Sequence, residues 1–195
     1  YVKMIAQNAW RSARIVEALR NYSYADEIQS AVTDLNMIID DALVLVQHQF
    51  RMEFNIQIVK QLDDNLKSIV LDHNRLTQAL INLLLNARDA MPPTGGTVEI
   101  RSWAASDEQG LLTSNGNGKP HEAYAFSVSD TGSGIAPELL NRIFDPFFTT
   151  KPFGKGTGLG LFIAKRIVEQ HNGRIWAENN ELGGATFTVI LPRKL

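Results

Sequence analysis

A run of alternating glycines near residue 156 has the composition of a phosphate-binding loop. It reads Gly154-Lys155-Gly156-Thr157-Gly158-Leu159-Gly160 and leads straight into an apolar helical pattern. Glycines leave backbone N–H groups accessible, and the positive dipole end of a helix N-terminus favours an anion. The spacing matches neither a Walker A motif nor G-x-G-x-x-G, since Leu161 stands at the last glycine position. A flexible linker is the alternative, but a linker would not normally run directly into an apolar helix.

Three amide side chains share one face of another predicted helix. Gln78, Asn82 and Asn86 follow an i, i+4, i+8 spacing within an apolar pattern at about 73–91, so they form one slowly drifting stripe. Asn is a poor helix former, so two of them in a leucine-rich helix need a reason. An amide oxygen is a hard, neutral ligand suited to Mg²⁺, which uses few protein ligands besides phosphates and water. Polar residues on a solvated face, or amides satisfied in the core, are the alternative.

An acidic residue followed by two glycines comes at the end of a predicted strand. The segment Asp130-Thr131-Gly132-Ser133-Gly134 follows a strand pattern that ends in Val128. A carboxylate in this position can accept a hydrogen bond from an exocyclic amine such as that of adenine. The glycines let the backbone approach a flat ligand. An ordinary Asp-Gly turn fits these residues equally well.

An aromatic segment lies between the two glycine clusters. Phe144-Asp145-Pro146-Phe147-Phe148-Thr149-Thr150-Lys151 places three phenylalanines in a stretch with little helical periodicity. Together with further prolines and glycines, this composition predicts that residues 137–156 form a mobile lid over a ligand. Ordinary core aromatics beneath a loop are the alternative on sequence physics alone.

The surrounding sequence predicts helices and strands that can position these groups. Helical apolar periodicity occurs over residues 1–22, 35–50, 73–91 and 159–171, with Asp34 expected to begin the second helix and Gly173 to end the last. Residues 54–59, 97–104, 122–129, 174–179 and 185–191 have strand patterns, and Asn115-Gly116-Asn117-Gly118 predicts a mobile hairpin tip. Helices mixed with largely hairpin-connected strands indicate an α+β sandwich with helices on one face of the sheet.

Composition excludes several classes of function. The net charge of −2 argues against nucleic acid as the main partner, since phosphate-backbone binders usually carry a basic excess. The absence of cysteine excludes disulfides, thiolate zinc sites and cysteine nucleophiles. No apolar run approaches the ~18 residues of a membrane span, so we expect a cytoplasmic chain without membrane contact of its own. Because the sequence begins with Tyr1 rather than Met, we expect it to be a fragment. This expectation is compatible with a membrane anchor upstream of Tyr1 in the full-length protein.

Five ordered motifs resemble the nucleotide-binding boxes of sensor histidine kinases. Asn82-Leu83-Leu84-Leu85-Asn86-Ala87 resembles the N box, Asp130-x-Gly132-x-Gly134 the first glycine box, Phe144 to Phe148 the phenylalanine box, Gly156-x-Gly158-x-Gly160 the second glycine box, and Gly183-Gly184-Ala185-Thr186-Phe187 with Leu191-Pro192 the closing segment. The resemblance covers about residues 28–193 and is nearest to the nitrogen-regulatory and oxygen-sensing kinases. The same superfamily holds type II topoisomerase ATPase domains, the 90-kDa heat-shock chaperone and mismatch-repair ATPases.

This resemblance implies a fold and a set of residue roles. The fold would be a two-layer α/β sandwich whose mixed sheet is covered by helices on one face. The implied ligands are ATP or ADP and Mg²⁺, with Asn86 on the metal, Asn82 in support, and Gln78 one turn earlier, where a family Glu would be the better base. Asp130 would bind the adenine amine and Thr186 would assist through water, while Gly132 and Gly134 would shape the base pocket. The phosphates would meet Gly156, Thr157, Gly158, Leu159 and Gly160, with Lys151 or Lys155 as the cation for the terminal phosphates.

The implied activity is transfer of the γ-phosphoryl group of Mg²⁺-ATP to a histidine, followed by relay to an aspartate of a response-regulator receiver domain. None of His48, His73, His121 and His171 is followed by an acid and a downstream Pro, as the family acceptor is. Residues 1–22 resemble the second helix of the family's dimerisation hairpin, so the acceptor would precede Tyr1. The expected division is a partial hairpin and linker over 1–27 and an ATP-binding catalytic domain over 28–195, with homodimerisation through the complete hairpin.

One position departs from the family pattern, and two other functions stay open. Many members carry Lys or Arg three residues past the metal-ligand Asn, where this chain has Asp89 beside Arg88, so the role of Arg88 is undecided. A superfamily ATPase that drives a conformational cycle is one rival, against which the leading helix and the kinase-like lid argue. A degenerate module that senses ATP and signals by docking is the other, against which the presence of Asn86 and Asp130 argues.

Overall fold

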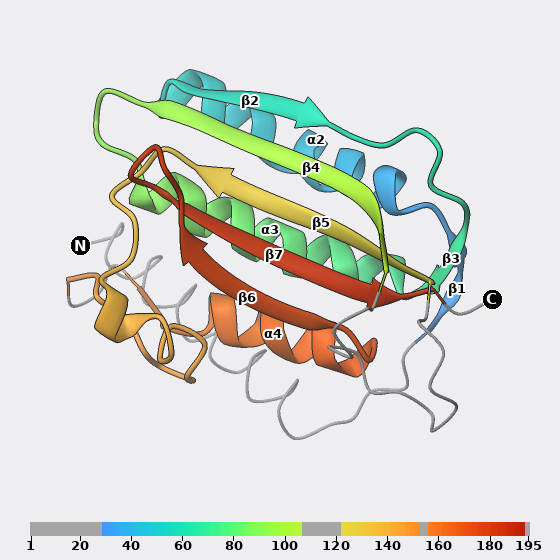
Figure 1. The fold of residues 1–195 in the computed structure, drawn as a ribbon. Helices are drawn as coiled ribbons and strands as arrows, with labels where there is room; N and C mark the ends of the chain where they lie inside the picture. The colour runs from blue at the N-terminus through green and yellow to red at the C-terminus, as the bar shows by residue number, and fades with distance from the viewer. Residues whose placement is uncertain (1–28, 107–121, 153–155, 194–195) are drawn as a thin grey trace, which may run out of the picture.

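The computed structural model describes residues 29–106, 122–152 and 156–193. A five-stranded sheet in the order β2-β4-β5-β7-β6 forms one layer, and helices α2, α3 and α4 cover one of its faces (Figure 1). The predicted α+β sandwich is therefore confirmed for the described ranges. In chain order the elements are β1 (Ala31–Thr33), α2 (Leu35–Glu53), β2 (Ile56–Gln61), β3 (Ile69–Leu71), α3 (His73–Ala90), β4 (Gly96–Ser106), β5 (Glu122–Asp130), η1 (Pro137–Leu139), α4 (Gly160–Gln170), β6 (Arg174–Asn179) and β7 (Ala185–Pro192).

The sheet is mixed, and its pleat decides which side chains reach the helices. Strand β2 runs parallel to β4, whereas the pairs β4–β5, β5–β7 and β7–β6 are antiparallel. Along β5, Phe126 and Val128 belong to the main core, while Ala123 and Ala125 form a small cluster with other residues. Side chains alternate between the two faces of a strand. Asp130 continues the series of Phe126 and Val128, so β5 delivers it to the helix-covered face.

Helix α3 carries the asparagine stripe into this core. The side chain of Asp72 caps the helix by accepting the backbone N–H of Arg75, and the last helical residue is Ala90. Pro92 follows two residues later, where a helix cannot readily continue. The prediction of a helix over 73–91 is confirmed to within one residue. The buried apolar residues of α3 are Leu76, Ala79, Leu80, Leu83, Leu84 and Ala87.

The end of α4 differs from the prediction in one residue. Asn172, not Gly173, adopts the left-handed conformation, with φ of 57°. The backbone N–H of Asn172 donates to Glu169 and that of Gly173 to Val168, both at 2.9 Å, which is the Schellman pattern. Asn tolerates this conformation better than most residues. Gly173 is needed for a different reason, since a Cβ there would lie 2.5 Å from the carbonyl oxygen of Ile190.

The other differences between the predicted and the observed elements concern two short strands and the ends of two elements. Strands β1 and β3 pair with each other in an antiparallel two-stranded sheet and have no counterpart in the sequence prediction. Three residues are too few to show an alternating pattern, so this pairing leaves no local signal. Helix α2 continues past residue 50 to Glu53, and β2 begins at Ile56 rather than at 54. Between them, Phe54 caps the helix and Asn55 turns the chain with φ of 50°.

Several predicted features lie outside the described residues. They are the helix over 1–22 and the hairpin-and-linker unit over 1–27, the Asn115–Gly118 turn, His121 and Lys155. Within the ranges that the structure describes, no helix combines the length and apolarity that a membrane crossing requires.

His171 joins the C-terminal end of α4 to the N-terminal end of α3. Its Nε2 accepts the backbone N–H of Asp72 at 3.0 Å, which leaves Nδ1–H to donate to the carbonyl oxygen of Ile167 at 2.7 Å. Because one ring nitrogen must accept, these contacts require the neutral imidazole. Burial lowers the pKa of His171, although the Ile167 carbonyl and the Asp72 carboxylate act in the opposite direction. The ring is therefore a neutral structural link between the two helices that flank the candidate site.

Acidification should destabilise the fold in a way that depends on His171. Below the unfolded-state pKa of about 6.5, the unfolded chain binds a proton that the folded ring does not. The free energy of unfolding should therefore decrease as the pH falls, until the folded-state pKa has been passed. Urea-unfolding midpoints between pH 8 and pH 5 should fall more steeply in the wild type than in His171→Gln. The control His48→Gln, at an exposed position, should keep the wild-type slope, and an unchanged slope in His171→Gln would contradict this account.

Candidate functional site

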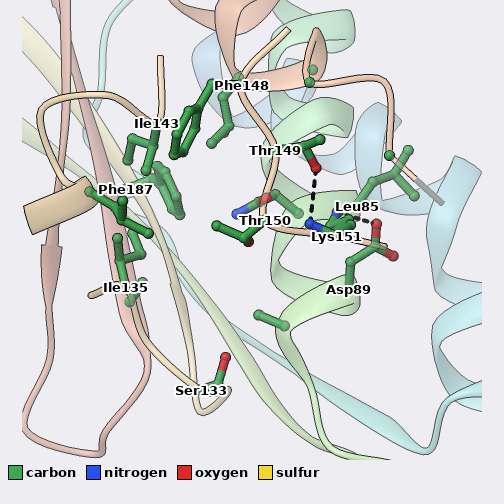
Figure 2. Close-up of a pocket in the computed structure, with 18 of the residues that line it drawn as sticks. Leu85, Asp89, Ser133, Ile135, Ile143, Phe148, Thr149, Thr150, Lys151 and Phe187 are labelled. Atoms are coloured by element: carbon green, nitrogen blue, oxygen red, sulfur yellow. Dashed lines mark hydrogen bonds and ion pairs between the residues drawn. The ribbon is translucent and has the colours of Figure 1, made fainter. Parts of the chain in front are cut away.

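The four chemically suggestive segments meet around one cavity of about 570 Å³. Residues of α3 line one side, and residues 133–151 line another together with the first residues of α4 and β7 (Figure 2). The cavity therefore lies where the helix-covered face of the sheet is reached by the segment that joins β5 to α4.

Asp130 contributes a buried carboxylate with one oxygen left without a partner. Its Oδ1 accepts the backbone N–H groups of Gly132 at 2.8 Å and of Ala185 at 3.3 Å. Its Oδ2 is buried and makes no hydrogen bond within the described part of the chain. Burial raises the pKa of Asp130, while the two backbone hydrogen bonds lower it. An unpartnered buried acceptor is costly in a folded protein, so this atom has the properties of a ligand-binding group.

Glycines on both sides of Asp130 allow the close packing that holds it. A Cβ at Gly132 would lie 2.6 Å from the carbonyl oxygen of Ala90, and one at Gly184 would overlap the backbone of Asp130. Asn180 ties the same strands together, since its Nδ2 donates to the carbonyl oxygen of Asp130 and its Oδ1 accepts the N–H of Gly184. The carboxylate is thus fixed by backbone packing and not by its own side-chain bonds alone.

Asn179 anchors the start of the segment that leaves β5. Its Oδ1 accepts the backbone N–H of Ile135, and its Nδ2 donates to the carbonyl oxygen of the same residue, both at 2.7 Å. Ile135 lines the cavity, so Asn179 positions part of the cavity wall. The sequence offered no signal for this pair, because the two residues are 44 positions apart.

Asn82 and Asn86 lie beside the cavity on successive turns of α3. Both line it, and Asn82 is buried with its Nδ2 unpartnered within the described residues. The position of a Cβ on Gly160 would be 3.7 Å from Asn82 Oδ1, so the start of α4 lies beside the amide stripe. The two helices therefore bring amide side chains and a helix N-terminus to the same side of the cavity.

The glycine run before α4 serves packing as well as access to backbone N–H groups. Gly158 has φ of 66°, and a Cβ there would overlap the backbone of Phe147. Helix α4 begins at Gly160 without a side-chain N-cap hydrogen bond. The first N–H groups of a helix have no intrahelical partner, so this end is suited to an anion.

The three aromatic residues of the Phe144–Phe148 segment have three different environments. Phe144 packs edge-to-face against Phe187 in the core, with ring centroids 6.3 Å apart. Phe148 lines the cavity with Ile135, Ile143 and Phe187 (Figure 2). Phe147 is 60% exposed and has φ of 65°. The core interpretation thus holds for Phe144, whereas Phe148 contributes to an apolar wall suited to a flat ligand.

One cation lines the cavity among the described residues. Lys151 lies with its Nζ 2.6 Å from Oδ2 of Asp89 (Figure 2). Asp89 also lines the cavity, but Arg88 does not. Lys155, the other predicted cation, lies outside the described residues.

The structure brings together most, but not all, of the predicted site residues. Asn82, Asn86, Asp130, Gly134, Lys151, Gly156, Thr157, Gly158 and Gly160 line the cavity. The predicted residues Gln78, Gly132, Leu159 and Thr186 are not among those that line it. Thr186 lies next to Ala185, which does line it, but the Thr186 hydroxyl pairs with that of Ser129 at 2.8 Å. Leu85, Asp89, Ala90 and Phe187 are lining residues to which the motifs assign no role. The first three lie three or four residues from Asn82 or Asn86 on α3, so helical spacing is the one sequence signal for them.

The arrangement suits a ligand that combines a flat base with an anionic tail. A carboxylate has one oxygen without a hydrogen-bond partner, apolar side chains form a wall, and asparagine residues lie beside glycine backbone and a helix N-terminus. Adenine nucleotides have these chemical features.

Comparison with known proteins gives the same indication. Residues 71–195 match the family model described as "Histidine kinase-, DNA gyrase B-, and HSP90-like ATPase". Sensor kinase CckA of Brucella abortus is 37% identical over 191 residues, which are 97% of this chain and 20% of CckA. Sensor protein FixL of Bradyrhizobium diazoefficiens is 35% identical over 96% of this chain and 34% of FixL. The chain thus spans about a fifth to a third of the length of these relatives.

Solved structures extend the comparison to the fold. Histidine kinase ThkA in complex with response regulator protein TrrA has a TM-score of 0.76 and 29% identity, over 100% of this chain and 51% of that one. Full-length ShkA in complex with AMPPNP has a TM-score of 0.73 and 28% identity, over 92% of this chain and 34% of that one.

Proposed function

Because the chain belongs to the histidine kinase-, DNA gyrase B- and HSP90-like ATPase family, we propose that it transfers the γ-phosphoryl group of Mg²⁺-ATP to a histidine outside this sequence. Its place in the family is the catalytic, ATP-binding domain of two-component sensor histidine kinases. In the proposed step the bond between the γ-phosphorus and the β–γ bridging oxygen breaks, that phosphorus bonds to an imidazole nitrogen, ADP leaves with the bridging oxygen, and the imidazole releases its ring proton to solvent. A response-regulator aspartate is the proposed later acceptor.

The observation that carries this proposal is a pair of unpartnered buried polar atoms on two residues that line one cavity. Asp130 Oδ2 is an acceptor and Asn82 Nδ2 is a donor, and neither has a hydrogen-bond partner within the described residues. Leaving such groups unsatisfied costs about 1–3 kcal/mol each. A nucleotide would satisfy both, because its base offers an amine to the carboxylate and its phosphates offer oxygens to the amide. The structure of a relative with AMPPNP supports a nucleotide as the ligand.

The residues of the cavity also fit Mg²⁺. Asn86 would hold the ion together with phosphate oxygens and water, which is the usual way in which this metal is bound. When bound, Mg²⁺ supplies charge neutralisation on the phosphates. The chain itself would orient the phosphates through the N–H groups that begin α4 and add positive charge through Lys151. Ile135, Phe148 and their neighbours would keep water from the base.

Positioning is the main contribution that the chain makes to the proposed step. Gln78 stands where the family has a candidate general base, but it does not line the cavity. Its amide group is in any case a poor proton acceptor. Phosphoryl transfer depends chiefly on in-line placement and on neutralising charge. The proposed domain therefore needs an acceptor delivered to it in the correct orientation.

The described histidines support an acceptor outside this chain. His48 is exposed on α2, His73 pairs with Asp41 at 2.8 Å, and His171 is buried between two helices. None of the three lines the cavity. The proposed organisation remains a partial hairpin and linker over 1–27, a catalytic domain over 28–195, and a homodimer through the complete hairpin. The complex of ThkA with TrrA supports a receiver domain as the partner.

Hydrogen exchange tests nucleotide binding and the lid together. Mg²⁺-AMPPNP should slow amide exchange over residues 137–152 more than over β4, because the first segment lines the cavity and has little regular structure. Strand β4 pairs on both sides within the sheet and serves as the internal reference. Equal protection of both regions with and without nucleotide would count against the lid, and absence of any binding would count against the function.

A further inference from the structure

Two charged residues at the C-terminal end of α3 have been given no functional role so far. Asp89 and Arg88 occupy the place where the chain departs from the family pattern, and Asp89 lines the cavity. Both carboxylate oxygens of Asp89 are engaged. Oδ1 accepts Nε of Arg88 at 2.8 Å, and Oδ2 accepts Nζ of Lys151 at 2.6 Å. Asp89 therefore links helix α3 to the segment that carries the cavity's lysine.

Arg88 is held away from the cavity by contacts with the α2 region. Its guanidinium donates to Gln49 Oε1 at 3.1 Å and lies over the ring of Phe54, 5.1 Å from the centroid. In this position it compensates the charge of Asp89 without meeting a ligand in the cavity. The group of Arg88, Asp89 and Lys151 has a formal net charge of +1, so Asp89 does not make this side of the cavity anionic.

We propose that Asp89 is a positioning residue that holds the ammonium group of Lys151 where it meets the terminal phosphates of the bound nucleotide. This inference rests on the proposed function. An ammonium group has three N–H donors, and the bond to Asp89 uses one of them. The backbone of Lys151 is also fixed, because its N–H donates to Thr149 Oγ1 at 3.2 Å (Figure 2). Two donors therefore remain for a phosphate while the side chain keeps its place.

The exposure of the pair argues for a role in binding and against one in folding. The side chains of Lys151 and Asp89 are 33% and 28% exposed. Ion pairs this accessible to water contribute little to stability. Loss of Asp89 should thus appear in the affinity for nucleotide and leave the melting temperature nearly unchanged.

Calorimetric titration with Mg²⁺-ATP and Mg²⁺-ADP tests the proposal on the whole 195-residue chain. Lys151→Met should weaken ATP binding about tenfold, as expected for a charge-assisted contact, and weaken ADP binding less. Asp89→Asn should weaken ATP binding about two- to fivefold, in the range of a partly exposed ion pair, and lower the ATP-to-ADP affinity ratio. The double variant should be no weaker than Lys151→Met, because no lysine remains to be positioned. Asp89→Glu should recover most of the ratio, since it keeps the carboxylate.

A matched control removes a similar ion pair elsewhere. Asp40 pairs with Lys60 at 2.7 Å, with side chains 51% and 49% exposed, and neither residue lines the cavity. Asp40→Asn makes the same change in net charge and should leave the affinity ratio unaltered. Tighter ATP binding by Asp89→Asn would show that Asp89 acts by repulsion, and further weakening in the Lys151→Met background would show that it acts without the lysine. Either result overturns the proposal, whereas a wild-type chain that binds no ATP overturns the proposed function instead.

Discussion

Replacing Asp130 with Asn should weaken ATP binding by about ten- to a hundredfold, equivalent to the roughly 1.5–3 kcal/mol of a hydrogen bond to a charged group. The hydrogen bonds around Asp130 explain the expected loss of affinity. Gly132 and Ala185 donate their backbone N–H groups to Oδ1, so an Asn in this place would keep its oxygen there. Its NH₂ group would then take the position of Oδ2, where a donor would face the adenine amine. One attractive contact would be replaced by two opposed donors.

The ratio of the affinities for ATP and GTP separates this effect from damage to the fold. Guanine carries a carbonyl where adenine carries its amine, so the amide introduced by Asp130→Asn can donate to GTP, and the ATP-to-GTP affinity ratio should fall together with ATP affinity. Because burial raises the pKa of Asp130, keeping its charge is unfavourable for folding, and the neutral substitute should not lower the melting temperature. Asp64→Asn, at an exposed position, serves as the control. Unchanged ATP affinity and an unchanged ratio in calorimetry would refute the assignment of the base contact.

Elements with a strong local pattern could be predicted from the sequence. Helix α3 shows this best, because its leucines repeat at helical spacing and a proline pair follows its end. The same pattern places Asn82 and Asn86 on one face, and both line the cavity. The glycine run was also informative, since its residues precede a helix whose N-terminus opens on the site.

Features that depend on contacts between distant segments could not be predicted. Strands β1 and β3 exist because residues 31–33 pair with residues 69–71, and neither triplet has a pattern of its own. Thr186 and Ala185 differ in their relation to the cavity because neighbouring residues of a strand point to opposite faces, and the motif alone does not give the register. The Asn179–Ile135 and Asp89–Lys151 contacts span 44 and 62 residues, so only the packing of the elements reveals them.

The geometry of the histidines leads to the second large effect, which is the absence of self-phosphorylation. His73 opens α3 thirteen residues before Asn86, about 20 Å along the helix axis at ~1.5 Å per residue. His171 follows the last residue of α4 and is buried, whereas the cavity lies at the other end of that helix, at Gly160. In-line attack requires the imidazole nitrogen close to the γ-phosphorus, and neither position allows it. His48 and His121 also lack the acid and downstream Pro that follow the family acceptor, so the chain should bind ATP without labelling itself.

Transfer from Mg²⁺-ATP, radiolabelled on its γ-phosphate, to a separately supplied hairpin distinguishes a kinase domain from a domain that only binds ATP. The hairpin is a dimerisation hairpin of the histidine kinase type, with its acceptor histidine on the first helix. The control Asn86→Ala should reduce transfer by about a hundredfold or more, because charge neutralisation by a bound metal is worth several kcal/mol. Acid-labile label should appear on the hairpin and not on the 195-residue chain; stoichiometric acid-labile label on the chain itself, or an unlabelled hairpin with a chain that binds ATP, would contradict the proposed transfer to an external histidine.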